Sequence, residues 1–190
     1  MENQKFDFNF AKEEVFQNAK EHGWWDSDRP AKEAVALMHS ELSEALEEYR
    51  NARPMLWYES EESKKPEGIG VELIDCVIRI LDFMGRYNLW FYDDQPRENE
   101  EDETLPELVA DLHHDLSEVL DTAWICDPIE TSEISEAEDC DHEQVASIFS
   151  QVVMDIFGWI EDQGCDPYEL MKLKNDYNKT RPYRHGGKVC

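Results

Sequence analysis

The sequence predicts an all-α protein, a bundle of helices around one hydrophobic core. Apolar residues recur at helical spacing through several segments rich in strong helix formers. Glycine or proline punctuates the ends of these segments, as at Gly23, Pro54, Gly68 and Gly164. Residues 69–88 are apolar nearly all round, which is typical of a central helix of a bundle. With 190 residues the chain is long enough for a real core, so we expect one all-α domain over 1–190.

The first two helices are predicted near the N-terminus. The first covers Phe8 to Glu21, and Gly23 ends it. The second covers about residues 30–52, with Asp28 as its expected N-cap and a proline in its first turn. Because Val35, Met38 and Leu42 share one stripe of this helix, that stripe is expected to face the core.

The remaining helices alternate with polar connections. A linker containing Pro66 and Gly68 precedes the third helix, which is favoured over a strand by its length and its polar stripe. Two acidic stretches, 93–104 and 127–143, are expected to be solvated connections. The helices predicted after the linker cover about residues 69–88, 105–125, 143–163 and 167–178.

Two pairs of carboxylates stand out in these helices. Glu41 and Glu44 are three residues apart, and so are Glu72 and Asp75. Residues i and i+3 are neighbours on one face of a helix, so each pair projects side by side. If the two helices pack together, four carboxylates converge, and their mutual repulsion favours a bound cation. Oxygen ligands on a rigid frame suit Mg²⁺ or Mn²⁺.

The first pair by itself has a simpler interpretation. Paired glutamates on a helix usually lie on a solvated face, and Glu41 and Glu44 alone do not predict a metal site. The second pair changes this, because Glu72 and Asp75 interrupt a helix that is otherwise apolar nearly all round. Buried carboxylates are costly unless they are paired or bound to metal. The two pairs together therefore indicate a divalent-metal site.

The composition of the chain disfavours several kinds of partner. The formal net charge of −27 disfavours binding to nucleic acid or to an anionic membrane, since both are polyanions. No apolar run approaches the roughly 20 residues needed to span a bilayer, and Met1 to Phe10 lack a signal-peptide core. The five cysteines are odd in number and include no C-x-x-C pair, so zinc spacing is absent. Reduced thiols and a cytoplasmic location are expected.

Two segments of the chain also resemble each other in sequence. The segment Glu41-Leu-Ser-Glu-Ala-Leu46 aligns with Asp115-Leu-Ser-Glu-Val-Leu120. Repeats over about 30–90 and 105–167 would form two helical hairpins in a pseudo-symmetric bundle. Helices also resemble one another by chance, so a true duplication and a fortuitous likeness both stay open.

The second half of this alignment has lost one acidic pair. Glu72 falls on Ile148, and Asp75 falls on Gln151. Asp115 and the glutamate three residues after it are retained. We therefore interpret these two carboxylates as a decayed or solvated copy of the first site.

The spacing of the carboxylates resembles a family signature. Glu41-x-x-Glu44, a gap of 27 residues and then Glu72-x-x-Asp75 is similar to the pattern of the MazG-like, all-α nucleoside triphosphate pyrophosphohydrolases. The likeness covers 24–88 and 165–188 well and the intervening third poorly. One departure is Ser40, which stands where the family often has the leading glutamate of its first element.

This resemblance implies a fold, an activity and a cofactor. It implies a MazG-like helical bundle that hydrolyses a (deoxy)nucleoside triphosphate to the monophosphate and pyrophosphate. Glu41, Glu44, Glu72 and Asp75 would hold Mg²⁺, with Mn²⁺ as the other suitable ion, and Glu44 could activate the water. It also implies a homodimer or higher homo-oligomer, unless the internal repeat makes one chain a pseudo-dimer.

Further residues are candidates for contacting the nucleotide. Basic side chains of the C-terminal segment could meet the phosphates, or could simply fold onto the acidic body. Two tryptophans could stack on a base, although a role in the core or an interface is the simpler interpretation for at least one. His39, His113 and His114 are interpreted as structural. The substrate-binding candidates are Lys179, Arg181, Arg184, Lys188, Trp24 and Trp25.

A second function class stays open. A non-catalytic acidic interaction protein, such as a DNA mimic, would also carry a strong negative charge. The two classes differ in where the carboxylates lie. A mimic displays them on exposed faces, whereas an enzyme buries a set among apolar residues such as Val71, Ile74 and Ile78.

Overall fold

The protein is all-α, as predicted. The computed structural model describes residues 6–60, 62, 64–93, 96–97, 103–122 and 136–187, with side chains from 142 onward in the last range. Within these residues an isolated antiparallel bridge joins Trp57 and Glu67 in the α2–α3 connection. The helices are α1 (Phe8–Glu21), α2 (Ala31–Arg50), α3 (Ile69–Arg86), α4 (Leu105–Val119), α6 (Glu136–Asp162), α7 (Pro167–Lys179) and the short α8 (Arg184–Gly187).

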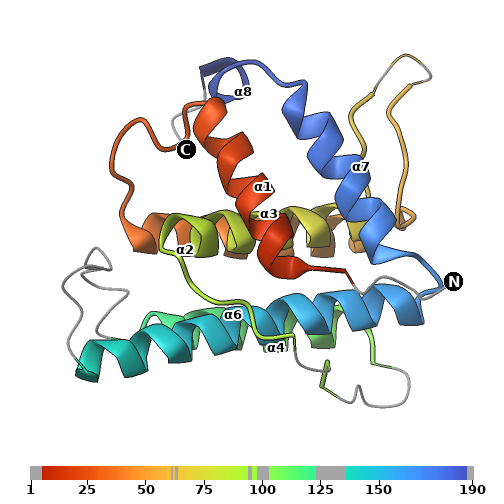
Figure 1. Cartoon of the computed structure of the whole chain (residues 1–190). Coiled ribbons are helices and arrows are strands. Elements are labelled where there is room, and N and C mark those ends of the chain that lie inside the picture. Colours follow the sequence, from red (N-terminus) through yellow and green to blue (C-terminus); the bar gives the residue numbers. More distant parts are fainter. Residues whose placement is uncertain are drawn as a thin grey trace, which may run out of the picture.

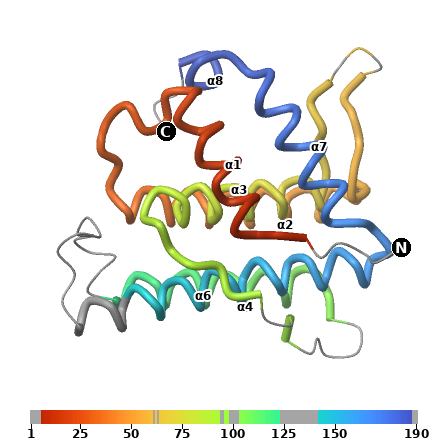
Figure 2. Tube along the Cα trace, in the orientation of Figure 1, coloured from red at the N-terminus to blue at the C-terminus, as the bar shows by residue number. Residues whose placement is uncertain are grey.

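The helices are arranged in three layers with α3 at the centre. Figure 1 shows α1 and α7 on one side, α2 and α3 in the middle, and α4 and α6 on the other side. Helix α3 contacts α1, α2, α6 and α7, and α2 also contacts α4. The same path is traced in Figure 2, where the C-terminal segment returns to the α1–α2 connection. A helix surrounded in this way must be apolar on most sides, which explains its composition.

The packing of α1 against α3 is unusually close. A Cβ atom added to Gly85 of α3 would lie 2.5 Å from Cβ of Phe16 on α1. Glycine therefore lets the two helices approach at this point. Val15 and Ala19, on the same face of α1, are buried and also line the cavity described below.

Several predicted helix boundaries are corrected. Pro30, and not Asp28, is the N-cap residue of α2, and its side chain makes no capping hydrogen bond. Helix α4 ends at Val119 instead of near residue 125. The N–H groups of the next three residues bond carbonyls three residues back, so the chain tightens into a turn there.

The acidic stretch 127–143 is also partly corrected. Helix α6 begins at Glu136, so residues 136–143 are helical and do not form a connection. Acidic residues are favourable in the first turns of a helix, because the N-terminal end of its dipole is positive. Residues 127–135, most of 93–104, residues 123–125 at the predicted end of the fourth helix, and Lys188 lie outside the described residues.

In the described part of the chain, no helix combines the length and the apolar character that a membrane crossing requires.

The buried residues form one contiguous hydrophobic core that includes side chains from all helices from α1 to α7 named above.

Candidate metal centre

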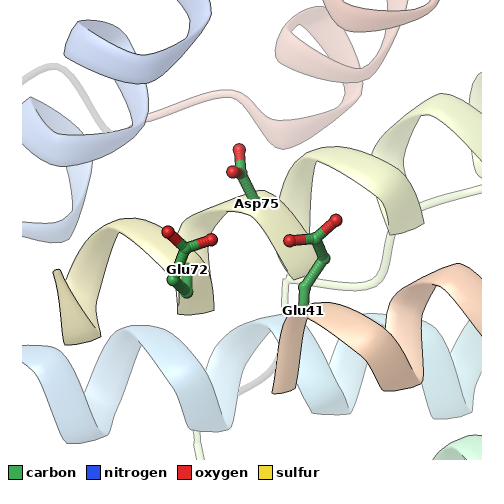
Figure 3. Close-up of side chains that lie close together, drawn as sticks. All are labelled: Glu41, Glu72 and Asp75. Atoms are coloured by element: carbon green, nitrogen blue, oxygen red, sulfur yellow. The ribbon is translucent and has the colours of Figure 1, made fainter. Parts of the chain in front are cut away.

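Three of the four predicted carboxylates come together. Figure 3 shows the side chains of Glu72 and Asp75 on α3 and of Glu41 on the adjoining α2 projecting to the same side of the two helices. One carboxylate oxygen from each of the three lies within 4.8 Å of those of the other two. Glu41 and Glu72 are each only 6% exposed. The cluster is therefore a compact, largely buried set of oxygen ligands.

Helical periodicity places these side chains at the edge of the core. On α2, Glu41 follows Met38 by three residues and continues its buried stripe. On α3, Glu72 lies in the first turn, where the helix dipole favours a negative charge. Asp75 is one turn further along the same face. The extensive contact between α2 and α3 then brings the two acidic faces together.

Two cations belonging to the protein itself contact the cluster. Nε of Arg79 donates to Oε1 of Glu41 at 2.5 Å. Nζ of Lys174, on α7, lies 2.7 Å from Oδ2 of Asp75. Lys174 is 2% exposed, so its ammonium group is held in the interior by this ion pair. Helices α2, α3 and α7 thus all contribute charge to one site.

The electrostatics leave the cluster short of positive charge. Burial, followed by the charge of Asp75, raises the pKa of Glu72 to about 8 even though Lys174 lowers it. Burial also raises the pKa of Glu41, against the opposing effect of Arg79. A raised carboxyl pKa means that the ionised form lacks enough compensating charge. A divalent cation would supply that charge.

The cluster lies in a cavity of about 310 Å³. Its walls carry the three clustered carboxylates and Glu44, and also cationic and aromatic side chains. The volume is in the lower part of the range typical of small-molecule sites. The polar and aromatic lining residues are Asn18, His22, Trp24, Arg29, Ser40, Glu41, Glu44, Lys65, Glu72, Asp75, Arg79, Asp82, Lys174, Asn178, Arg181 and His185.

A second group of residues lines the cavity further along α3. Asp82 accepts a hydrogen bond from Nε1 of Trp25 at 2.8 Å. Burial raises the pKa of Asp82 to about 7, although Trp25 and Arg29 lower it. Arg29 lies over the rings of both Trp24 and Trp25, at 5.5 and 5.4 Å from their centroids. Asp82 is two turns beyond Asp75, which separates the two positions by about 10 Å along the helix axis.

Glu44 and Trp24 line the cavity, whereas Trp25 does not. Glu44 is exposed and lines the cavity, but it is not part of the three-carboxylate cluster. Its Oε1 accepts a hydrogen bond from Ser40 at 3.2 Å. Trp24 lines the cavity beside His185, whereas Trp25 contacts Phe16 and is held by Asp82.

The predicted cations of the C-terminal segment lie in different places. Arg181 lines the cavity. Arg184 is directed to the α1–α2 connection, where its Nε donates to the carbonyl of Gly23 at 3.0 Å. Lys179 pairs with Asp176 on its own helix. Arg181 is therefore the predicted tail cation that the described residues bring to the cavity.

The site also contains residues that the sequence patterns did not predict. Lys174 follows Leu170 and Met171 on the buried stripe of α7, and a lysine on a core stripe is the signal that could have identified it. Lys65 comes from the α2–α3 connection, and Arg29 from the segment before α2. Neither has a spacing pattern relative to the carboxylates, so only the fold reveals them.

Comparison of the chain with protein-family models, with curated proteins and with solved structures finds no match. The resemblance to MazG-like enzymes therefore stays a prediction from the residues quoted above.

Proposed function

We propose that the protein is a divalent-metal-dependent nucleoside triphosphate pyrophosphohydrolase of the MazG-like type, acting in the control of nucleotide pools. The observation that carries this proposal is the cluster of Glu41, Glu72 and Asp75 at the cavity wall. Two of these carboxylates are buried among apolar residues of α2 and α3. This position favours an enzyme over an acidic mimic, which would display such groups to solvent.

The residues present fit Mg²⁺ or Mn²⁺. Three carboxylates within ligand distance of one another are the oxygen donors that these hard cations prefer. Glu41, Glu72 and Asp75 would hold the ion, with Glu44 as a further ligand from the cavity edge. The metal would neutralise negative charge on phosphate oxygens and polarise the phosphorus centre.

The chain's own groups account for binding and proton transfer. Arg181 and Lys174 would contact phosphate oxygens, Arg181 through its planar pair of donors. Trp24 would offer a flat face to the base. Glu44 is exposed and is not among the three clustered carboxylates, so where it is not fully used as a ligand it would accept a proton from the attacking water. Water attack at the α-phosphorus then releases pyrophosphate and the monophosphate.

Pyrophosphate release from a panel of NTPs and dNTPs tests the proposal. We expect release in Mg²⁺ that is abolished by EDTA and by Glu72→Gln or Asp75→Asn, with helical circular dichroism retained. Glu118→Gln is a matched control, because Glu118 is the exposed counterpart of Glu44 in the second half and does not line the cavity. If no nucleotide of the panel releases pyrophosphate, or if Asp75→Asn retains the release, this function is excluded.

A further inference from the structure

Aligned residues of the two halves of the chain meet between α2 and α4. His39 on α2 and His113 on α4 stand at equivalent positions, each two residues before the aligned Glu41 and Asp115. Their rings stack with an interplanar angle of 14°, and their Nδ1 atoms lie 2.7 Å apart. In a two-fold arrangement, a residue near the axis meets its own counterpart. A pseudo-two-fold axis between α2 and α4 would produce a contact of this kind.

A local contact is also repeated on the two helices. Oγ of Ser43 donates to the carbonyl of His39 at 2.9 Å. Oγ of Ser117 donates to the carbonyl of His113 at 2.7 Å. The helix pairs α2/α3 and α4/α6 are both packed in the structure, so the pairing of elements agrees with the aligned residues.

In the second half, an arginine binds two aspartates at positions aligned with residues of the first site. Asp115 corresponds to Glu41, and Asp155 on α6 corresponds to Arg79 when the alignment of the third helix is extended. Nη2 of Arg97 donates to both Asp115 and Asp155. Its Nε also donates to Oδ2 of Asp155 at 2.7 Å, and its backbone N–H donates to Oδ1 at 2.8 Å. The two carboxylates thus converge on one cationic group.

The residues aligned with Asp75 and Glu72 are uncharged. Gln151, which corresponds to Asp75, donates its amide to Asp155 at 2.8 Å. Ile148 corresponds to Glu72 and adds no charge. Asp115 and Asp155 are 9% and 3% exposed, so they need a countercharge in place. A guanidinium supplies that charge permanently and fits two carboxylates through its fixed fork of donors.

We propose that Arg97 is a built-in cation that closes the second acidic site, so that divalent metal is excluded there and binds only at the Glu41/Glu72/Asp75 cluster. At the Asp115/Asp155 pair a side chain then supplies the positive charge that an ion supplies at the first cluster. This inference shares the metal site of the proposed function but does not rest on nucleotide hydrolysis.

Removing Arg97 should open the second site to Mn²⁺. The test uses the full chain in a Glu72→Gln background, which weakens the first cluster, and follows free Mn²⁺ by electron paramagnetic resonance. We expect Arg97→Met to bind about one additional Mn²⁺ per chain and to gain thermal stability when Mn²⁺ is added. Arg97→Lys keeps a cation and should gain neither. Adding Asp155→Asn to Arg97→Met should remove the extra binding.

Two results would overturn the proposal. One is an Arg97→Met protein that binds no more Mn²⁺ than its parent. The other is Mn²⁺ binding in the parent that Asp155→Asn removes, because the second site would then already be open. If Arg97→Met does not fold without metal, the triple variant Arg97→Met, Asp115→Asn and Asp155→Asn, with Glu72 restored, decides. Recovery of cooperative unfolding in the triple variant supports the proposal, and no recovery contradicts it.

Discussion

At the scale of single residues, Glu72 carries the least compensated charge of the cluster. It is buried beside Asp75, and its pKa of about 8 lies above the ordinary value of 4.5. When metal is absent, the folded protein therefore favours the protonated carboxyl at pH values below about 8. A group with a raised folded-state pKa stabilises the fold fully below its unfolded pKa and loses that contribution as the pH rises through the folded value.

We predict that the metal-free protein loses thermal stability between about pH 5 and about pH 9, and that saturating Mg²⁺ reverses the loss at the alkaline end. Melting curves in EDTA and in MgCl₂ at several pH values measure this. Glu72→Gln cannot ionise, so its melting temperature in EDTA should fall less over the same range. Equal slopes for the two proteins would contradict the assignment to Glu72.

At the scale of secondary-structure elements, α7 brings Lys174 to the cluster from outside the α2/α3 pair. Leu170 and Met171 bury the same face of the helix, so the lysine is carried into the interior with them. Its ion pair with Asp75 is 2.7 Å long. The helix is thus anchored by an apolar stripe and by one charge pair.

We predict that Lys174→Met destabilises the metal-free protein by about 3 kcal/mol, because it leaves Asp75 without its partner in a partly buried site. Mg²⁺ should restore much of this loss by replacing the missing charge. Urea unfolding with and without Mg²⁺ measures both effects. Lys172→Met, at an exposed position of α7, is the control and should change little. A Lys174→Met protein as stable as wild type in EDTA would count against the ion pair.

The start of α3 depends on the backbone of Gly68. This residue has φ of +123°, and an added Cβ would lie 2.6 Å from the carbonyl oxygen of Pro54. The N–H groups of Ile69 and Gly70 bond the carbonyls of Pro54 and Met55, which ties the helix start to the preceding connection. The carbonyl of Gly68 accepts from the N–H of Glu72. The position of Glu72 is therefore set partly by this turn.

We predict that Gly68→Ala destabilises the protein by about 2 kcal/mol or more and weakens Mg²⁺ binding, since it must shift the first turn of α3. Gly164→Ala provides a matched control. Gly164 also has a positive φ, of +76°, but a Cβ there would meet nothing within 4 Å, so only a conformational cost of about 1 kcal/mol is expected. Calorimetric titration with Mg²⁺ compares the two variants. Equal metal affinity in both would argue that the turn does not position Glu72.

At the scale of the whole molecule, the net charge of −27 opposes compaction. Screening by salt weakens repulsion between exposed charges, but it acts much less on the buried cluster. A general and a site-specific effect of cations can therefore be separated.

We predict that NaCl raises the melting temperature of the protein, and that MgCl₂ at the same ionic strength raises it further. The additional increment should disappear in Glu72→Gln, whereas the NaCl effect should persist. Thermal melts in matched salts distinguish the two contributions. If Glu72→Gln retains the full Mg²⁺ increment, then the ion acts on the surface charge as a whole and not on the cluster.

Much of the fold was predictable because it depends on local patterns. The bounds of α1 agree with the prediction, since Asp7 caps its start and Gly23 follows its end. The boundaries that failed lie where local signals are ambiguous. Acidic residues that looked like a solvated connection form the first turns of α6, and the predicted end of the fourth helix becomes a turn after Val119.

The candidate site was likewise predictable in part from local patterns. Helical spacing alone placed Glu72 beside Asp75, and apolar neighbours indicated that α3 would be buried. The sequence by itself therefore determined the all-α class and the acidic faces of α2 and α3. Only the tertiary structure decided that Glu44 stays outside the three-carboxylate cluster, that Lys174 enters it and that Arg97 joins Asp115 to Asp155. These contacts join residues far apart in the chain, and their geometry depends on how helices pack, which no local spacing specifies.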